Sequence, residues 1–192
     1  MMRRGQSLLE LLVAFFVIAI GWMSAVTLVF SNLALVDRDA NEVVAVNLAR
    51  EGIEFAKNIR DSNWLAGADF DAGLYNPTVD YTATPVWDAI SGIVSLDVTA
   101  NDFTHERTKI IKASNGLLIN RPSSPPPSTD TVHQRLMTLG PICYNDETAT
   151  YTIYPTFCVG RRVGIRVESR VRSTRKGTSK DVVMYEDLYD WR

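Results

Sequence analysis

Residues 1–30 read MMRRGQSLLELLVAFFVIAIGWMSAVTLVF, and this stretch decides the fold. A short basic leader ends at Gly5, and Glu10 is the first acidic residue after it. The next charged residue is Asp37, so Leu11 to Val36 carries no charge at all. About 20 apolar residues suffice for a helix to cross a bilayer. An ionised side chain beside such a span is rare and by default marks a functional site. We therefore predict a membrane-spanning helix with a functional carboxylate at its start.

Two ordinary interpretations of this N-terminus have to be weighed. A secretory signal peptide has a shorter apolar run that is closed by a small-residue cleavage site, and neither feature occurs here. A plain signal anchor fits better, because Arg3 and Arg4 agree with a cytoplasmic N-terminus by the positive-inside rule. A plain anchor, however, gives no reason for Glu10, whose ionised form is costly near the membrane interior.

The segment from Gly5 to Glu10 resembles the cleavage signal of type IV prepilins and pseudopilins, in which a glycine ends the leader and a glutamate is the fifth mature residue. The resemblance implies that a prepilin peptidase cuts after Gly5 and methylates the new N-terminus at Gln6. The chain departs from the family pattern at Gln6, where Phe is usual, and at Ser7, where Thr is common. It also lacks the proline that many pilins carry in this apolar helix, and Gly21 would instead supply a more flexible position in the helix.

The same resemblance implies a place and a set of partners. The chain would be stored in lipid in the bacterial inner membrane, with its head outside the cytoplasm. An inner-membrane assembly platform would then pack its N-terminal helix against those of other pilin subunits, in an extracellular pilus or a periplasmic pseudopilus. Glu10 would meet the positive α-amino group of Gln6 in a neighbouring subunit. Because burial costs both ions their solvation, the pair would act mainly as a register device.

The C-terminal residues, 187–192, resemble the close of many minor pilins, so we expect a non-enzymatic minor pilin. Two alternatives stay open: a pseudopilin of type II secretion, and a bitopic membrane protein whose extracytoplasmic head binds a ligand. Adhesion, motility, DNA uptake and secretion are all compatible with the sequence.

Chain length and charge set limits on the rest. The 192 residues can hold one membrane helix and one modest globular domain. The net charge is -2, and removal of a leader containing Arg3 and Arg4 would take it to -4. No overall basic character therefore points to nucleic acid as a partner.

Apolar residues continue at helical spacing beyond the membrane segment. They are Ala45, Leu48, Ala49, Gly52, Ala56 and Ile59. We predict one helix from about Leu8 to about Arg60, whose second half packs one face on the head and ends in turn-forming residues. Trp64 should then cover the core of the head. The expected fold is α+β and type IV pilin-like: a long N-terminal helix packed on a C-terminal antiparallel sheet. We divide it into a leader (1–5), a membrane and assembly helix (6–36), a helix continuation (37–62) and a β-rich head (63–192).

Strand signals are confined to the head. Residues 66–88 are rich in turn formers and predict an irregular region. We expect short strands at 93–98, 109–112 and 116–119, and an extended proline-rich linker at 121–129. The clearest signal is a C-terminal hairpin, in which apolar and polar residues alternate from Val163 to Arg172 and the chain returns through 180–186.

The two cysteines, Cys143 and Cys158, lie in the part of the chain that the helix orientation places outside the cytoplasm. An even count in an oxidising compartment predicts one disulfide. A zinc site is the weaker alternative, because no CxxC pair exists and neither histidine is near a cysteine in the sequence. We expect no metal and no cofactor.

Basic residues cluster on the C-terminal hairpin and form a candidate patch for nucleic acid or for a subunit interface. They are Arg162, Arg166, Arg170, Arg172, Arg175 and Lys176. Phosphate contacts from such a face would depend strongly on salt. A solvated edge, or an interface with the acidic residues of 186–190, is the favoured interpretation, and the apparent lack of interleaved aromatic residues weakens single-strand binding.

No catalytic constellation is recognisable. The chain has no GxSxG elbow, no GxGxxG and no phosphate-binding loop. His105 and His133 are expected to be ordinary surface histidines. The sequence therefore favours a structural or binding role over an enzyme.

Overall fold

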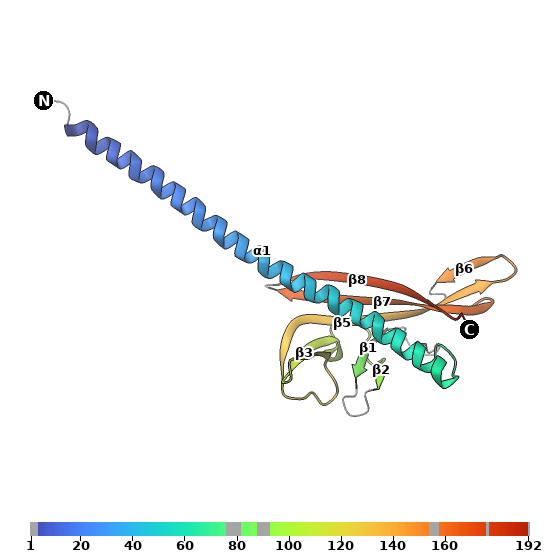
Figure 1. The fold of residues 1–192 in the computed structure, drawn as a ribbon. Helices are drawn as coiled ribbons and strands as arrows, with labels where there is room; N and C mark the ends of the chain where they lie inside the picture. Colours follow the sequence, from blue (N-terminus) through green and yellow to red (C-terminus); the bar gives the residue numbers. More distant parts are fainter. Residues whose placement is uncertain (1–3, 76–81, 88–92, 154–157, 176, 192) are drawn as a thin grey trace. The chain divides into compact units, whose positions relative to one another are not determined.

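The computed structural model describes residues 4–75, 82–87, 93–153, 158–175 and 177–191, with side chains described from Leu8 onward except at Ala34. The chain divides into two units, Met1–Asn41 and Glu42–Arg192. One helix, α1 (Arg4–Ala66), contributes to both. The other elements all belong to the second unit (Figure 1). They are β1 (Thr82–Trp87), β2 (Val94–Asp97), the short 3-10 helix η1 (Glu106–Thr108), β3 (Lys109–Ala113), β4 (Leu118–Asn120), β5 (Ser128–Asn145), β6 (Thr150–Ile153), β7 (Arg161–Arg175) and β8 (Thr178–Tyr189).

The architecture is α+β, as predicted: a long N-terminal helix whose C-terminal turns pack on an antiparallel sheet (Figure 1). β5 is the central strand. Along one side it pairs with β7, which pairs in turn with β8, and along the other side it pairs with β1, β3 and β6. Every strand pairing is antiparallel. The predicted C-terminal hairpin is therefore confirmed as β7 and β8.

β5 is the main element that the sequence did not predict. It is 18 residues long and contains Pro141, which cannot donate a hydrogen bond and so argues against a central strand. Among the described residues, β1 pairs with β5 up to Thr138 and β6 pairs from Ile142 onward, so no described residue of either strand is in register with Pro141. β1 is a second correction, because its residues fall in the region expected to be irregular. The predicted proline-rich linker is shorter than expected, since Ser128 already belongs to β5.

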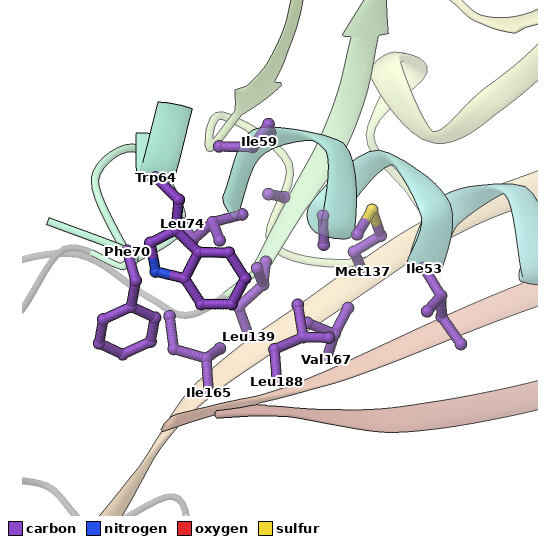
Figure 2. Close-up of a cluster of buried hydrophobic side chains, with 12 residues drawn as sticks. Ile53, Ile59, Trp64, Phe70, Leu74, Met137, Leu139, Ile165, Val167 and Leu188 are labelled. Carbon is purple, nitrogen blue, oxygen red and sulfur yellow. The ribbon is translucent and has the colours of Figure 1, made fainter. Parts of the chain in front are cut away.

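The core lies between α1 and the sheet (Figure 2). Its larger cluster joins α1 residues to the inner face of β5, β7 and β8, and it comprises Ile53, Ala56, Ile59, Trp64, Phe70, Leu74, Ala83, Met137, Leu139, Ile165, Val167 and Leu188. A second cluster joins Ala45, Leu48 and Ala49 to Ile110 and Val171. The predicted inner face of the helix and the predicted role of Trp64 are thus confirmed. Burial of such apolar surface, at about 25 cal/mol per Å² of area removed from water, is what fixes α1 to the sheet.

A buried arginine crosses this interface. The side chain of Arg135, on β5, is 1% exposed. Its guanidinium donates to the backbone oxygen of Leu48 (3.0 Å), to the carboxylate of Glu51 (2.8 Å) and to Oδ1 of Asn120 (2.8 Å). Burial lowers the pKa of Arg135, and the Glu51 carboxylate opposes that shift. Because a buried charge without a partner is strongly destabilising, the two acceptors on α1, Leu48 and Glu51, fix the position of the helix along the strands.

Gly52 lets the helix approach this closely. A Cβ at Gly52 would overlap Oγ of Ser169 and would lie 3.5 Å from Cδ of Arg135. Ser169 is fully buried on β7, and its Oγ has no hydrogen-bond partner among the described residues. The small side chains on both elements therefore make room for the arginine between them.

The helix ends later than predicted, at Ala66 instead of near Arg60. Gly67 has φ of 68° and its N–H donates to the oxygen of Trp64, while the N–H of Ala68 donates to the oxygen of Asn63. These two bonds form the glycine-dependent end known as a Schellman motif. The Asn63 side chain does not stop the helix; its amide donates to the backbone oxygens of Phe70 and Ala72 and so holds the next loop.

His133 is a further correction, because it is a buried residue of β5 and not a surface histidine. Its Nδ1 lies 2.7 Å from Oγ of Ser173, and burial lowers the pKa of the imidazole. His105 is partly exposed, and its Nδ1 accepts from the N–H of Arg107 at the start of η1. Each histidine therefore has a local structural role.

Gly52→Ala should lower the free energy of unfolding of the head by about 1–3 kcal/mol, because the added methyl group overlaps Ser169 in a packed core. Ser169→Ala removes an unpaired buried hydroxyl and should be close to neutral. The double variant should recover much of the loss, with a coupling of about 1 kcal/mol or more between the sites. Urea unfolding of the four proteins in detergent measures this cycle.

Gly21→Ala is the matched control, since no atom lies within 4 Å of a Cβ at that position. It should leave the stability of the head unchanged. Additive losses in the double variant would show that the Gly52–Ser169 contact does not set the helix-to-sheet distance.

Candidate functional site

The first unit is a helix whose apolar side chains have no cover. All described side chains from Leu8 to Ala40 are exposed, and they include Phe15 at 62%, Trp22 at 73% and Phe30 at 67%. From Leu8 onward α1 is long enough and apolar enough to cross a membrane. Such a surface is not stable in water, because burying each large apolar side chain is favourable by about 1.5–3 kcal/mol.

Three hydroxyl groups of this segment form hydrogen bonds within the helix itself. The hydroxyl groups of Ser24, Thr27 and Ser31 each donate to a backbone oxygen three or four residues earlier, at 2.9 Å. A lipid environment offers no water to such groups, so internal bonds of this kind are what it requires. These three hydroxyl groups therefore suit an apolar surrounding, as the apolar side chains do.

Glu10 lies on the exposed surface of α1 at the start of this segment. Among the residues that the structure describes, no basic side chain forms an ion pair with it. The backbone at Gly5 and Gln6 is helical, and their side-chain positions lie outside the described part of the chain. The predicted cleavage and methylation roles of Gly5 and Gln6, and the assembly role of Glu10, stay predictions.

The arginines of β7 lie on the outer face of the hairpin. Acidic residues of the same chain form ion pairs with them. Arg166 forms a bidentate pair with Asp187 (2.6 and 2.7 Å). Arg172 does the same with Asp181 (2.8 and 2.9 Å). Arg170 donates to Glu168 at 2.8 Å. These contacts largely neutralise the predicted patch, since a paired guanidinium has little charge left for a phosphate.

The remaining members of the predicted patch lie apart. Arg175 is exposed at the end of β7, and Lys176 falls outside the described residues. Arg162, near the other end of β7, forms an ion pair with the buried Asp71. That pair borders a hollow of about 550 Å³ which Trp64, Phe70 and Asp190 also line. Burial raises the pKa of Asp71, although the Arg162 charge acts in the opposite direction.

Aromatic rings do interleave with the arginines, contrary to the sequence-based expectation. The guanidinium carbon of Arg172 lies 4.3 Å from the ring centroid of Phe103, and that of Arg166 lies 5.4 Å from the ring centroid of Tyr185. The Tyr185 contact crosses from β7 to β8, so it is invisible within either strand alone. The alternation in β8 places Tyr185 on the same face as Asp181 and Asp187, and that pattern is the signal that could have revealed it.

The predicted disulfide between Cys143 and Cys158 is present, and their Cα atoms are 5.5 Å apart. Cys143 belongs to β5 and Cys158 follows β6, so the bond closes the hairpin that these strands form. Within the described ranges no group of three or more His, Cys, Asp or Glu residues is arranged to hold a metal ion.

Comparison with known proteins gives no relative. The chain matches no protein-family model, no curated protein and no solved structure. The interpretation of the site therefore rests on its own residues.

Neutralisation of the hairpin face leads to a prediction about nucleic acid. Combining Asp181→Asn with Asp187→Asn removes the carboxylates that pair with Arg172 and Arg166, so the slope of log affinity for duplex DNA against log salt should steepen by about 2. The wild-type protein should bind weakly and with a shallow slope. Fluorescence anisotropy with labelled duplex DNA over a salt series measures both.

A control with the same change in net charge combines Asp69→Asn with Glu147→Gln, exposed residues for which the described chain shows no ion pair. This control should bind as the wild type does. Tight binding by the wild-type protein at physiological salt would contradict the neutralisation argument.

Proposed function

We propose that this chain is a structural subunit, a minor pilin, of a type IV pilus-like filament. In this proposal a prepilin peptidase removes residues 1–5 and methylates Gln6. The mature chain is stored in the inner membrane. An assembly platform then packs its N-terminal helix against those of other pilin subunits. The filament would be extracellular, and no catalytic step by this chain is involved.

One observation carries the proposal: a fully exposed apolar helix has a single carboxylate, Glu10, at its start. A lipid bilayer can cover the apolar side chains equally well without that carboxylate. A bundle of similar helices can cover them too, and it offers Glu10 a partner, the positive N-terminus of a neighbouring subunit. The position of Glu10 is explained by the bundle and unexplained by a plain anchor.

The energetics give Glu10 a selective role. An unpaired charge in a low-dielectric bundle costs several kcal/mol, and an oppositely charged neighbour offsets this only when the two groups are close. A neighbour shifted along the helix axis would leave both charges buried and unpaired. The pair therefore selects one axial offset between subunits, which a continuous apolar surface cannot do by itself.

The second unit supports the same role. Arg135 and the two core clusters attach residues 45–64 of α1 to the sheet, so the C-terminal part of the helix is an integral part of the head. The N-terminal part of α1 would pack against other subunits, and its C-terminal part belongs to the core of the head. Packing of the helices would therefore also place the folded head on the filament. The disulfide-closed hairpin fits a head that operates outside the cytoplasm.

Glu10→Val should leave membrane insertion and leader removal intact and reduce incorporation into filaments by at least about tenfold, the equivalent of 1.4 kcal/mol. The reason is that the variant still has its apolar span but no partner for the neighbouring N-terminus. Immunoblots of sheared filaments and of membrane fractions, from cells that also express the assembly machinery, give the two quantities.

Glu10→Asp keeps the carboxylate and is the matched control; it should retain most of the incorporation. Normal incorporation of Glu10→Val would refute the role of the charge pair. Recovery of the wild-type chain only in periplasmic filaments would favour a secretion pseudopilin, and an uncut chain that stays in the membrane would favour a bitopic binding protein.

A further inference from the structure

The outermost strand on one side of the sheet, β8, is a long edge strand with an apolar centre. Among the described strands it pairs with β7 alone, over all of its 12 residues and without a bulge. Residues 182–185, at its centre, are apolar, and Val183 is 44% and Tyr185 69% exposed. Natural sheets usually blunt such an edge with charged side chains, a proline, a bulge or a covering segment, because its free N–H and C=O groups invite another strand. β8 has charged residues on both sides of its apolar centre, but it contains no proline and no bulge.

The opposite edge near the end of the head is β6. Within the described part of the chain it pairs only with β5, and all four of its side chains are exposed. Tyr151 is 64% and Ile153 37% exposed. The Cys143–Cys158 bond closes the hairpin that presents this strand. β6 is therefore a second short row of free backbone groups with apolar side chains, held in place by a covalent bond.

The two edges run in opposite directions. β7 is antiparallel to β5 and β8 is antiparallel to β7, so β8 runs in the same direction as β5. β6 is antiparallel to β5 and so runs against β8. When two copies of the head stand side by side in the same orientation, β8 of one and β6 of the other are antiparallel, which is the more stable form of strand pairing.

We propose that β8 of one copy of this chain pairs with β6 of the next copy, so that one sheet continues from head to head. The inference rests on the proposed function, because copies inserted into one membrane by the same N-terminal helix share one orientation. Main-chain hydrogen bonds supply the attraction, as in other cases of strand addition. The contact joins two different surfaces, and such heterologous contacts generate helical filaments when they do not close into a ring.

The hydrogen-bond pattern identifies the groups of β8 that are available. The N–H of Asp190 donates to the oxygen of Val163, and residues of an antiparallel pair alternate between bonded and outward-facing positions. The N–H groups of Val183, Tyr185 and Asp187 therefore face the free edge. Those of Met184 and Glu186 are directed to β7.

A photocrosslinking amino acid, benzoylphenylalanine, tests the contact in the full-length chain. Placed at Tyr185, it replaces an exposed aromatic residue by another and should capture from a second copy the peptide that contains β6. Placed at Phe16, on the exposed apolar helix, it reports helix packing between copies. Mass spectrometry of the cross-linked membranes, with the prepilin peptidase and assembly platform present, identifies the captured peptides.

The three outcomes are distinct. Capture of β6 from Tyr185, together with helix capture from Phe16, supports the inference. In the second outcome, Phe16 captures a helix, but Tyr185 captures nothing or captures a peptide other than β6. This outcome overturns the inference and leaves the proposed function intact. Absence of capture from Phe16 overturns the proposed function and the inference with it.

Proline substitutions on β8 provide a second test. Tyr185→Pro removes an outward-facing N–H without removing a bond to β7, so the head should still fold. Capture of β8 by a reporter at Tyr151 should then fall about tenfold, the effect of one or two lost backbone hydrogen bonds. Ser179→Pro makes the same change on the same edge, six residues from Tyr185 and beyond the reach of the four-residue β6 when β6 is paired at Tyr185, and it should leave the capture unchanged. The inference would be overturned if the reporter protein without a proline, the Tyr185→Pro variant and the Ser179→Pro variant had equal thermal stability and gave equal capture of β8.

Discussion

The apolar surface of α1 between Leu11 and Val36 is the constraint on which the rest of the structure depends. No part of the described chain covers it, and at about 25 cal/mol per Å² the exposed area is too large to leave in water. This part of α1 therefore requires an apolar surrounding. Lipid and a bundle of similar helices both meet that need, and in the proposed function Glu10 would discriminate between them, because the bundle would give its charge a partner.

In the second unit the same helix is part of the core of a folded domain. Between Ala45 and Trp64 one face of α1 is a core element, and its burial against β5, β7 and β8 depends on Gly52 and Ser169 being small enough for close approach. Arg135 then places a charge across this contact and takes three acceptors from α1 and β4. Apolar burial determines that the helix packs on the sheet, and the arginine determines where along the strands it does so.

Local patterns predicted the helix and the terminal hairpin well, because each is visible within a single stretch of sequence. The inner face of α1 follows the 3.6-residue period, and β7 follows the two-residue period from Val163 onward. β5 was missed because its evidence is not local: Pro141 and the preceding prolines argue against a strand, whereas the strand is formed by pairing with β1, β3, β6 and β7, which lie elsewhere in the sequence. His133 and Arg135 were missed for the same reason, since polar residues give no sign of burial until their partners from other elements are known. The arginine face was found, and its neutralisation by Asp181 and Asp187 follows from a cross-strand register that one strand does not reveal.

The two units also suggest different kinds of contact between copies. In the proposed filament, contacts through α1 would be apolar and positioned by one charge pair, so they would tolerate many helical partners of similar length. Contacts through the β8 and β6 edges would depend on main-chain hydrogen bonds and strand direction, and they would require a partner with a matching free edge. Together they would allow a common assembly segment to be combined with a selective head.

The most direct measurement is the N-terminal residue and the mass of the chain co-expressed with a prepilin peptidase, compared with the Gly5→Val variant. The account predicts a wild-type product that begins at Gln6 with a methylated amino group, and an uncut variant. An intact N-terminus in both proteins would contradict it, because Glu10 would then have no positive N-terminus to meet and the chain would be a simple membrane anchor for its β-rich head.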